Sequence, residues 1–136
     1  MDTVDDLRDS LAQASFTVMA VLSRVAAEHD LSLTQLRMLG ILRDREPAMA
    51  ELARYLGLER STVSGLIDRA VQRGLVRKTS DAADGRSVRV SLTAEARRME
   101  TRVIGQIGDL LAPLTDRLNS SDQKRLSALL AKLLDH

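Results

Sequence analysis

Residues 48–93 read AMAELARYLGLERSTVSGLIDRAVQRGLVRKTSDAADGRSVRVSLT, and this stretch decides the fold. Its apolar residues first recur at helical spacing in two runs, and then alternate along two short β-branched runs. Two helices followed by a β-hairpin make a winged helix-turn-helix, in which the second helix is the recognition helix. We therefore predict a mainly α fold with a small β-hairpin wing.

The first helix of the motif follows Pro47, a residue that a helix tolerates in its first turn. Its apolar stripe consists of Met49, Leu52, Ala53 and Leu56. Gly57 comes directly after this stripe, where a residue in the left-handed conformation commonly ends a helix. The turn at residues 57–60 then leads into the second helix.

The predicted recognition helix has an apolar side and a polar side. The apolar stripe contains Val63, Leu66, Ile67, Ala70 and Val71, and Gly74 ends the helix. The polar side has small hydroxyl groups near its start, at Ser61 and Thr62, and basic groups further along, at Arg69 and Arg73. A helix in the major groove contacts DNA mainly through its N-terminal residues, so small side chains there allow a close approach.

The periodicity changes from helical to alternating at Leu75. Residues 75–79 and 87–92 are the β-branched runs, and in the second run Val88, Val90 and Leu92 face inward. The loop between the runs contains an Asp-Gly step at residues 84–85, which favours a tight turn. Arg86 then lies near the tip of a hairpin, from which an arginine can reach the minor groove.

Several runs of this sequence resemble the bacterial multiple-antibiotic-resistance regulator (MarR) family. They are residues 58–69 (LERSTVSGLIDR), 73–76 (RGLV), 84–87 (DGRS) and 92–93 (LT), preceded by residues 30–36 (DLSLTQL) at the entry to the helix before the motif. The resemblance extends over essentially the whole chain. It implies a homodimeric transcription factor that binds double-stranded operator DNA, usually a repressor that a small-molecule effector releases. It also implies that the recognition helix enters the major groove and the wing arginine the minor groove.

The predicted DNA-binding residues come from both parts of the motif. They are Arg60, Ser61, Thr62, Ser64, Gly65 and Arg69 on the recognition helix, and Arg77, Lys78 and Arg86 on the hairpin. Two positions depart from the family pattern. Gly65 stands where relatives often carry an arginine that faces the bases, and Glu59 stands at the N-cap, where the family favours a serine. Base readout is therefore expected to rest on fewer side chains than usual.

The positive charge is concentrated on the motif. The formal net charge of the 136-residue chain is only +1, yet residues 31–93 carry 11 basic and 7 acidic side chains, whereas residues 1–30 carry 2 and 6. Such a distribution is expected of a protein that binds phosphates. The chain has no cysteine, and its two histidines, His29 and His136, lie far apart in sequence, so we expect no metal and no cofactor.

The sequence gives no sign of export or of a membrane span. The start, MDTVDD, is acidic where a signal peptide would be basic. No apolar run approaches the ~20 residues that cross a bilayer. We therefore expect one soluble cytoplasmic domain over residues 1–136.

Long amphipathic helices are predicted on both sides of the motif. One occupies the first ~25 residues, a second begins at the capping box Ser32-x-x-Gln35, a third follows Thr93 and is kinked or ended by Pro113, and the last follows Asn119. Their apolar stripes exceed what one small winged helix can cover, which favours a homodimer over packing within one chain. We assign dimerisation to residues 1–30 and 94–136, and DNA binding to residues 31–93.

A two-fold dimer predicts a pseudo-palindromic operator, because it places two recognition helices in successive major grooves. A cleft between the dimerisation helices and the DNA-binding part would suit an effector. The family's manner of binding suggests Phe16, Met19, Ser23, Met38 and Leu42 as its lining, although a place in the core is the simpler role for each.

Two other classes of function fit the sequence less well. A winged helix can be a protein-interaction module, but such a module would not need the clustered arginines. An enzyme would need a nucleophile with a base, or a pair of carboxylates, in a pocket. The chain has no cysteine, no second histidine near the first and no glycine-rich phosphate loop, so a DNA-binding regulator is the better interpretation.

Overall fold

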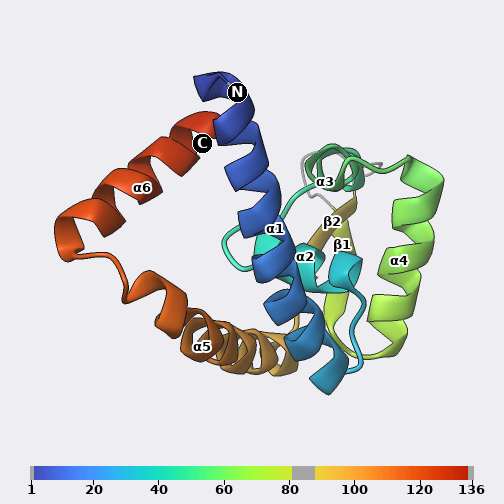
Figure 1. Cartoon of the computed structure of the whole chain (residues 1–136). Coiled ribbons are helices and arrows are strands. Elements are labelled where there is room, and N and C mark those ends of the chain that lie inside the picture. The colour runs from blue at the N-terminus through green and yellow to red at the C-terminus, as the bar shows by residue number, and fades with distance from the viewer. Residues whose placement is uncertain (1, 81–87, 135–136) are drawn as a thin grey trace. The chain divides into compact units, whose positions relative to one another are not determined.

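The computed structural model describes residues 2–80 and 88–134, and Figure 1 shows their helices and strands. The chain divides into two compact units. The winged-helix unit is Leu22–Ile104, and the terminal unit combines Met1–Val21 with Gly105–His136. Both boundaries fall inside helices, α1 (Thr3–Glu28) and α5 (Ala94–Thr115), so these two helices are the covalent connections between the units.

The winged-helix unit has the predicted order of elements. Its complete elements are α2 (Leu33–Leu42), α3 (Met49–Leu56), α4 (Arg60–Gln72), β1 (Val76–Ser80) and β2 (Val88–Leu92). The strands are antiparallel, with a register that runs from Val76 opposite Leu92 to Ser80 opposite Val88. Helix α4 packs against α3 and β1, while α2 packs against α3 and β2 (Figure 1). The prediction of a mainly α fold with a β-hairpin wing is confirmed.

The core of this unit consists largely of the predicted apolar stripes, although Val71, expected in the stripe of α4, is 39% exposed. Its largest fully buried side chains are Val25, Met38, Leu39, Leu42, Leu52, Val63, Ile67, Leu75, Val76 and Val90. On β2, Val90 and Leu92 are buried with the half-buried Ser91 between them, as expected, but Val88, expected to face inward with them, is only half-buried. Burial of these stripes fixes which face of α4 is left for other contacts.

The predicted helix ends are confirmed. Gly57 and Gly74 have φ values of 67° and 74°, which residues other than glycine rarely adopt. At the start of α2, Ser32 and Gln35 form the reciprocal hydrogen bonds of a capping box. Pro47 precedes α3 rather than lying in its first turn, and its carbonyl oxygen accepts a hydrogen bond from the N–H of Val90 (3.0 Å).

The terminal unit leaves much apolar surface exposed. Helix α6 (Ser120–Leu133) begins at Asn119, whose side chain accepts a hydrogen bond from the N–H of Asp122 (2.8 Å). No residue described in α6 is buried. Helix α5 continues two residues beyond Pro113 and ends at Thr115. The exposed large apolar side chains of this unit are Val4, Leu7, Leu11, Phe16, Met19, Leu126, Leu129, Leu130, Leu133 and Leu134.

The expected core role of the candidate cleft residues is wrong for two of them. Met38 and Leu42 are core residues, but Phe16 and Met19 are 73% and 48% exposed, so a place in the core of the single chain is not their role. By length and composition alone, α1 could cross a membrane, with a mean hydropathy of 1.3 over 18 residues, but the core helices of soluble proteins have the same composition. Small residues such as Ala20 and Ala26 raise this mean without forming a continuous run of large apolar side chains.

Candidate nucleic-acid interface

The face of α4 opposite its buried stripe carries the predicted helical site. Val63, Leu66, Ile67 and Ala70 are buried, and this orientation exposes Arg60, Ser61, Thr62, Ser64 and Arg69, with Gly65 half-buried among them. The structure therefore brings the six predicted residues of the helix onto the part of α4 that its own unit does not cover.

The start of α4 has free main-chain donors. Its N-cap, Glu59, makes no side-chain hydrogen bond to the helix. The first N–H groups of a helix lack partners within it, and the helix dipole makes this end positive, so an anion such as a phosphate is favoured here. Within the described residues no ion pair joins Glu59 to Arg54 or Arg60, so its carboxylate is not neutralised by either of them.

Gly65 and Arg69 are neighbours on the exposed face of α4. A Cβ atom at position 65 would lie 3.4 Å from Nη1 of Arg69. The guanidinium of Arg69 thus extends back over the glycine, toward the middle of the helix. A cation therefore lies beside the position where the family pattern has a long side chain and this sequence has none.

The wing contributes two predicted residues that the structure describes. Arg77 is exposed on β1, and Lys78 beside it forms an ion pair with Asp68 of α4 (Nζ to Oδ1, 2.9 Å). Both side chains of that pair are largely exposed, so the pair contributes little to stability. Arg86, the predicted tip residue, and the Asp-Gly turn at 84–85 lie outside the described residues.

The arginines of the winged-helix unit fall into two groups. Arg60, Arg69 and Arg77 have no hydrogen-bond or ion-pair partner among the residues that the structure describes. Others hold the fold together by donating to main-chain carbonyl oxygens: Arg37 to Tyr55 (2.9 Å), Arg73 to Asp30 (2.7 Å) and Arg89 to Glu46 (3.0 Å). The pattern of charge along the sequence cannot make this distinction, because each of these contacts is long-range.

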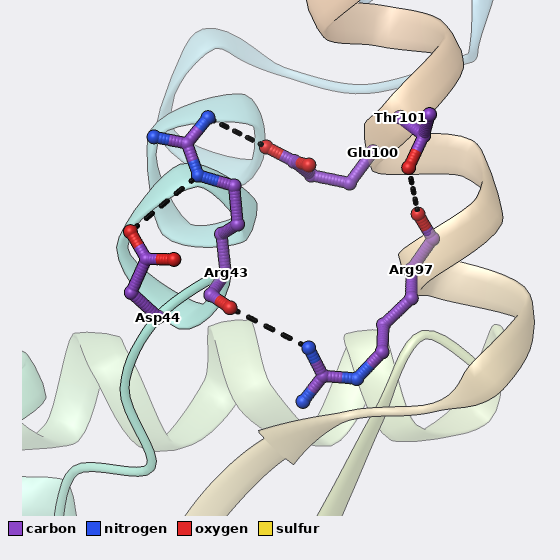
Figure 2. A network of polar contacts seen from close by, with 5 residues as sticks. All are labelled: Arg43, Asp44, Arg97, Glu100 and Thr101. Atoms are coloured by element: carbon purple, nitrogen blue, oxygen red, sulfur yellow. Dashed lines mark hydrogen bonds and ion pairs between the residues drawn. The ribbon is translucent and has the colours of Figure 1, made fainter.

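A second polar site links the end of α2 to the first turns of α5 (Figure 2). Glu100 is only 6% exposed, and its carboxylate lies 3.5 Å from the guanidinium of Arg43, which also pairs with Asp44 (3.6 Å). Arg97 donates to the carbonyl oxygen of Arg43 (3.4 Å). Burial raises the pKa of Glu100, Arg43 opposes this effect and Asp44 adds to it. The sequence pattern does not single out this site.

A pocket of about 370 Å³ lies at the same place, lined by Arg43, Leu92, Arg97, Glu100, Thr101 and Ile104. Its cations are already engaged within the network, so the pocket presents little free charge to a ligand. Over residues 2–80 and 88–134, no group of three or more His, Asp or Glu side chains is arranged to hold a metal ion.

Comparison with known proteins identifies transcriptional regulators. Residues 29–87 match the model of the MarR family. The chain is 26% identical to the HTH-type transcriptional repressor NicR of Pseudomonas putida, over 98% of this chain and 85% of that protein. It is 27% identical to the HTH-type transcriptional regulator PecS of Dickeya dadantii, over 93% of this chain and 79% of that protein. These relatives are regulators and not enzymes.

Solved structures show the same fold. The repressor CouR bound to a 23-mer DNA duplex matches with a TM-score of 0.77 at 24% identity, over 92% of this chain and 89% of that one. NadR in complex with 4-hydroxyphenylacetate matches with a TM-score of 0.81 at 22% identity, over 93% of this chain and 91% of that one. At such identities the likeness establishes the fold alone.

Proposed function

We propose that this chain is a regulator of the MarR type, which its matches to that family support, and that it is a homodimeric repressor that binds a pseudo-palindromic operator in double-stranded DNA. The observation that carries the proposal is the exposed face of α4. It combines an uncapped helix start, small hydroxyl side chains and cations that have no partner among the described residues.

Phosphates and bases would be contacted by different parts of this face. The free N–H groups at the start of α4 and the unpartnered cations Arg60, Arg69 and Arg77 suit phosphate oxygens, which give affinity without sequence preference. Ser61, Thr62 and Ser64 are short enough to let the helix approach base edges, and their hydroxyl groups can both donate and accept hydrogen bonds there. Arg86 is assigned to the minor groove from the sequence alone.

Control of DNA binding by a small molecule is consistent with the proposed repressor function. NadR has been solved with 4-hydroxyphenylacetate and CouR with p-coumaroyl-CoA, so proteins with this fold bind small molecules that contain an aromatic ring. We propose that this regulator also responds to an effector in the cytoplasm. An effector that binds the DNA-free conformation more tightly than the DNA-bound conformation lowers the affinity for the operator. The operator affinity falls by the ratio of the effector's affinities for these two conformations.

The proposal is tested by titrating operator and scrambled duplexes at several salt concentrations. Arg69→Gln should weaken binding to both duplexes and lower the log–log salt slope by roughly 0.9 for each phosphate that the arginine no longer neutralises. Thr62→Ala should instead cost about 1 to 3 kcal/mol on the operator, with little change on scrambled DNA, if its hydroxyl reads a base.

Arg117→Gln is the matched control, because it removes the same charge from an exposed arginine of the terminal unit. It should leave affinity and salt slope nearly unchanged. Equal affinity of the unaltered protein for operator and scrambled duplexes would contradict the proposal and favour the alternative, a winged-helix module that binds another protein.

A further inference from the structure

Arg73 joins the ends of two helices that are distant in sequence. It is the C-cap residue of α4. Its guanidinium donates from Nη1 to the carbonyl oxygen of Asp30 (2.7 Å) and from Nη2 to the carbonyl oxygen of His29 (3.1 Å). These oxygens lie directly after the end of α1, so one planar side chain bridges two successive peptide groups.

The end of α1 provides the acceptors for this side chain. Asp30 has a φ of 55°, and the N–H groups of Asp30 and Leu31 donate to Ala27 (3.1 Å) and Ala26 (2.9 Å), as in a Schellman motif. This motif satisfies those two carbonyl groups and leaves the oxygens of His29 and Asp30 pointing outward. The last turn of α1 contains no basic residue to balance the negative end of its dipole. Arg73 supplies both the hydrogen bonds and the charge from another helix.

The same end of α4 is also tied to α5. The hydroxyl of Thr93 donates to the carbonyl oxygen of Gly74 (2.7 Å) and accepts from the N–H of Ala96 (3.1 Å) in the first turn of α5. The end of the recognition helix therefore contacts both helices that connect the two units of the chain.

We propose that Arg73 is a positioning residue: it fixes the recognition helix to α1 and thereby sets the distance between the two recognition helices of the dimer. The inference rests on the proposed DNA-binding function. Arginine suits the role because its fork reaches two carbonyl oxygens at once, which the single ammonium group of lysine cannot do in the same geometry. Because both terminal nitrogens are already engaged, Arg73 differs from Arg69, which is free to contact phosphate.

The first test compares operators whose half-sites are separated by one base pair more or fewer than in the best operator. The unaltered protein should discriminate strongly between these spacings. Arg73→Gln and Arg73→Lys should each weaken binding to the best operator severalfold, because neither side chain can hold both carbonyl oxygens and the position of α4 is then less fixed. Both should discriminate less between spacings, while the salt slope stays that of the unaltered protein. Arg69→Gln should do the opposite, lowering the salt slope and preserving the discrimination.

The second test needs no DNA and measures hydrogen exchange of residues 26–31. The N–H groups of Asp30 and Leu31 should exchange several times faster in Arg73→Gln, but not in Arg69→Gln, because only the first change frees the end of α1. Unchanged exchange, or a lower salt slope with unchanged spacing discrimination, would overturn the inference. If the unaltered protein shows no preference for an operator, the proposed function fails, and the exchange measurement still decides whether Arg73 holds α1.

Discussion

At the scale of single residues, glycines of the same motif serve different physical needs. Gly57 has a positive φ and nothing within 4 Å of the position of a Cβ atom, so the backbone alone requires it. Gly65 lies inside α4 with ordinary helical geometry, and its neighbour is the flexible end of Arg69. The first glycine is needed by the turn, and the second leaves room on the exposed side of α4.

Gly65→Ala should therefore stabilise the protein. A methyl group would meet Arg69 at 3.4 Å, an ordinary contact, and alanine is favoured over glycine inside a helix by about 1 kcal/mol. Operator affinity should nevertheless fall, because the methyl group restricts the guanidinium lying over it. Urea unfolding and duplex titration measure the two effects.

Gly57→Ala is the matched control, since it is the same chemical change at a position with positive φ. It should destabilise the protein by about 1 kcal/mol or more, because alanine is strained there. If both substitutions changed the free energy of unfolding in the same direction, the assignment of different roles to the two glycines would be wrong.

At the scale of elements, the contact between α2 and α5 carries a buried carboxylate (Figure 2). Burial raises the pKa of Glu100, so the folded protein holds the proton of this group up to a higher pH than the unfolded chain does. The stability that this group contributes is therefore fully present below its unfolded pKa and is lost as the pH rises through its folded pKa.

Glu100→Gln should remove this part of the pH dependence. We compare the free energy of unfolding of the two proteins between about pH 4 and pH 7. As the pH rises, the stability of the unaltered protein should decrease relative to that of the variant. Asp109→Asn is the control, because it removes an exposed carboxylate of α5 that lies outside this network, and it should change the profile little. Parallel profiles for Glu100→Gln and the unaltered protein would show that burial does not perturb this carboxyl group.

Elements were predictable from sequence where their signals are local. Gly57, Gly74 and the capping box at Ser32 each act within a few residues, and the structure confirms them. The partners of the arginines were not predictable, because they depend on contacts across the fold. Arg73 lies on the polar side of α4 by its spacing, yet its guanidinium contacts carbonyl groups more than 40 residues earlier in the chain. The burial of Glu100 was not predictable either, because it depends on the packing of α5 against the end of α2.

At the scale of the whole molecule, the apolar surface of the terminal unit has to be covered. Five leucines of the C-terminal segment are exposed: Leu126, Leu129, Leu130, Leu133 and Leu134. Burying one leucine side chain fully contributes roughly 1.5 to 3 kcal/mol, so a contiguous set is a strong reason to associate. Homodimerisation, which the proposed function requires, is the direct way to cover them.

The double substitution Leu129→Lys, Leu133→Lys should convert the dimer into a monomer. Each leucine is 57% exposed in the single chain, so lysine costs little there, but a dimer interface would bury the charge of four lysines without partners. Sedimentation should show the loss of the dimer, and specific operator binding should disappear with it, because a monomer engages only one half-site. Ala128→Lys adds one positive charge per chain on the opposite face of α6 and should remain dimeric and bind the operator. A double variant that stays dimeric and retains full operator affinity would place the dimer interface outside this face of α6.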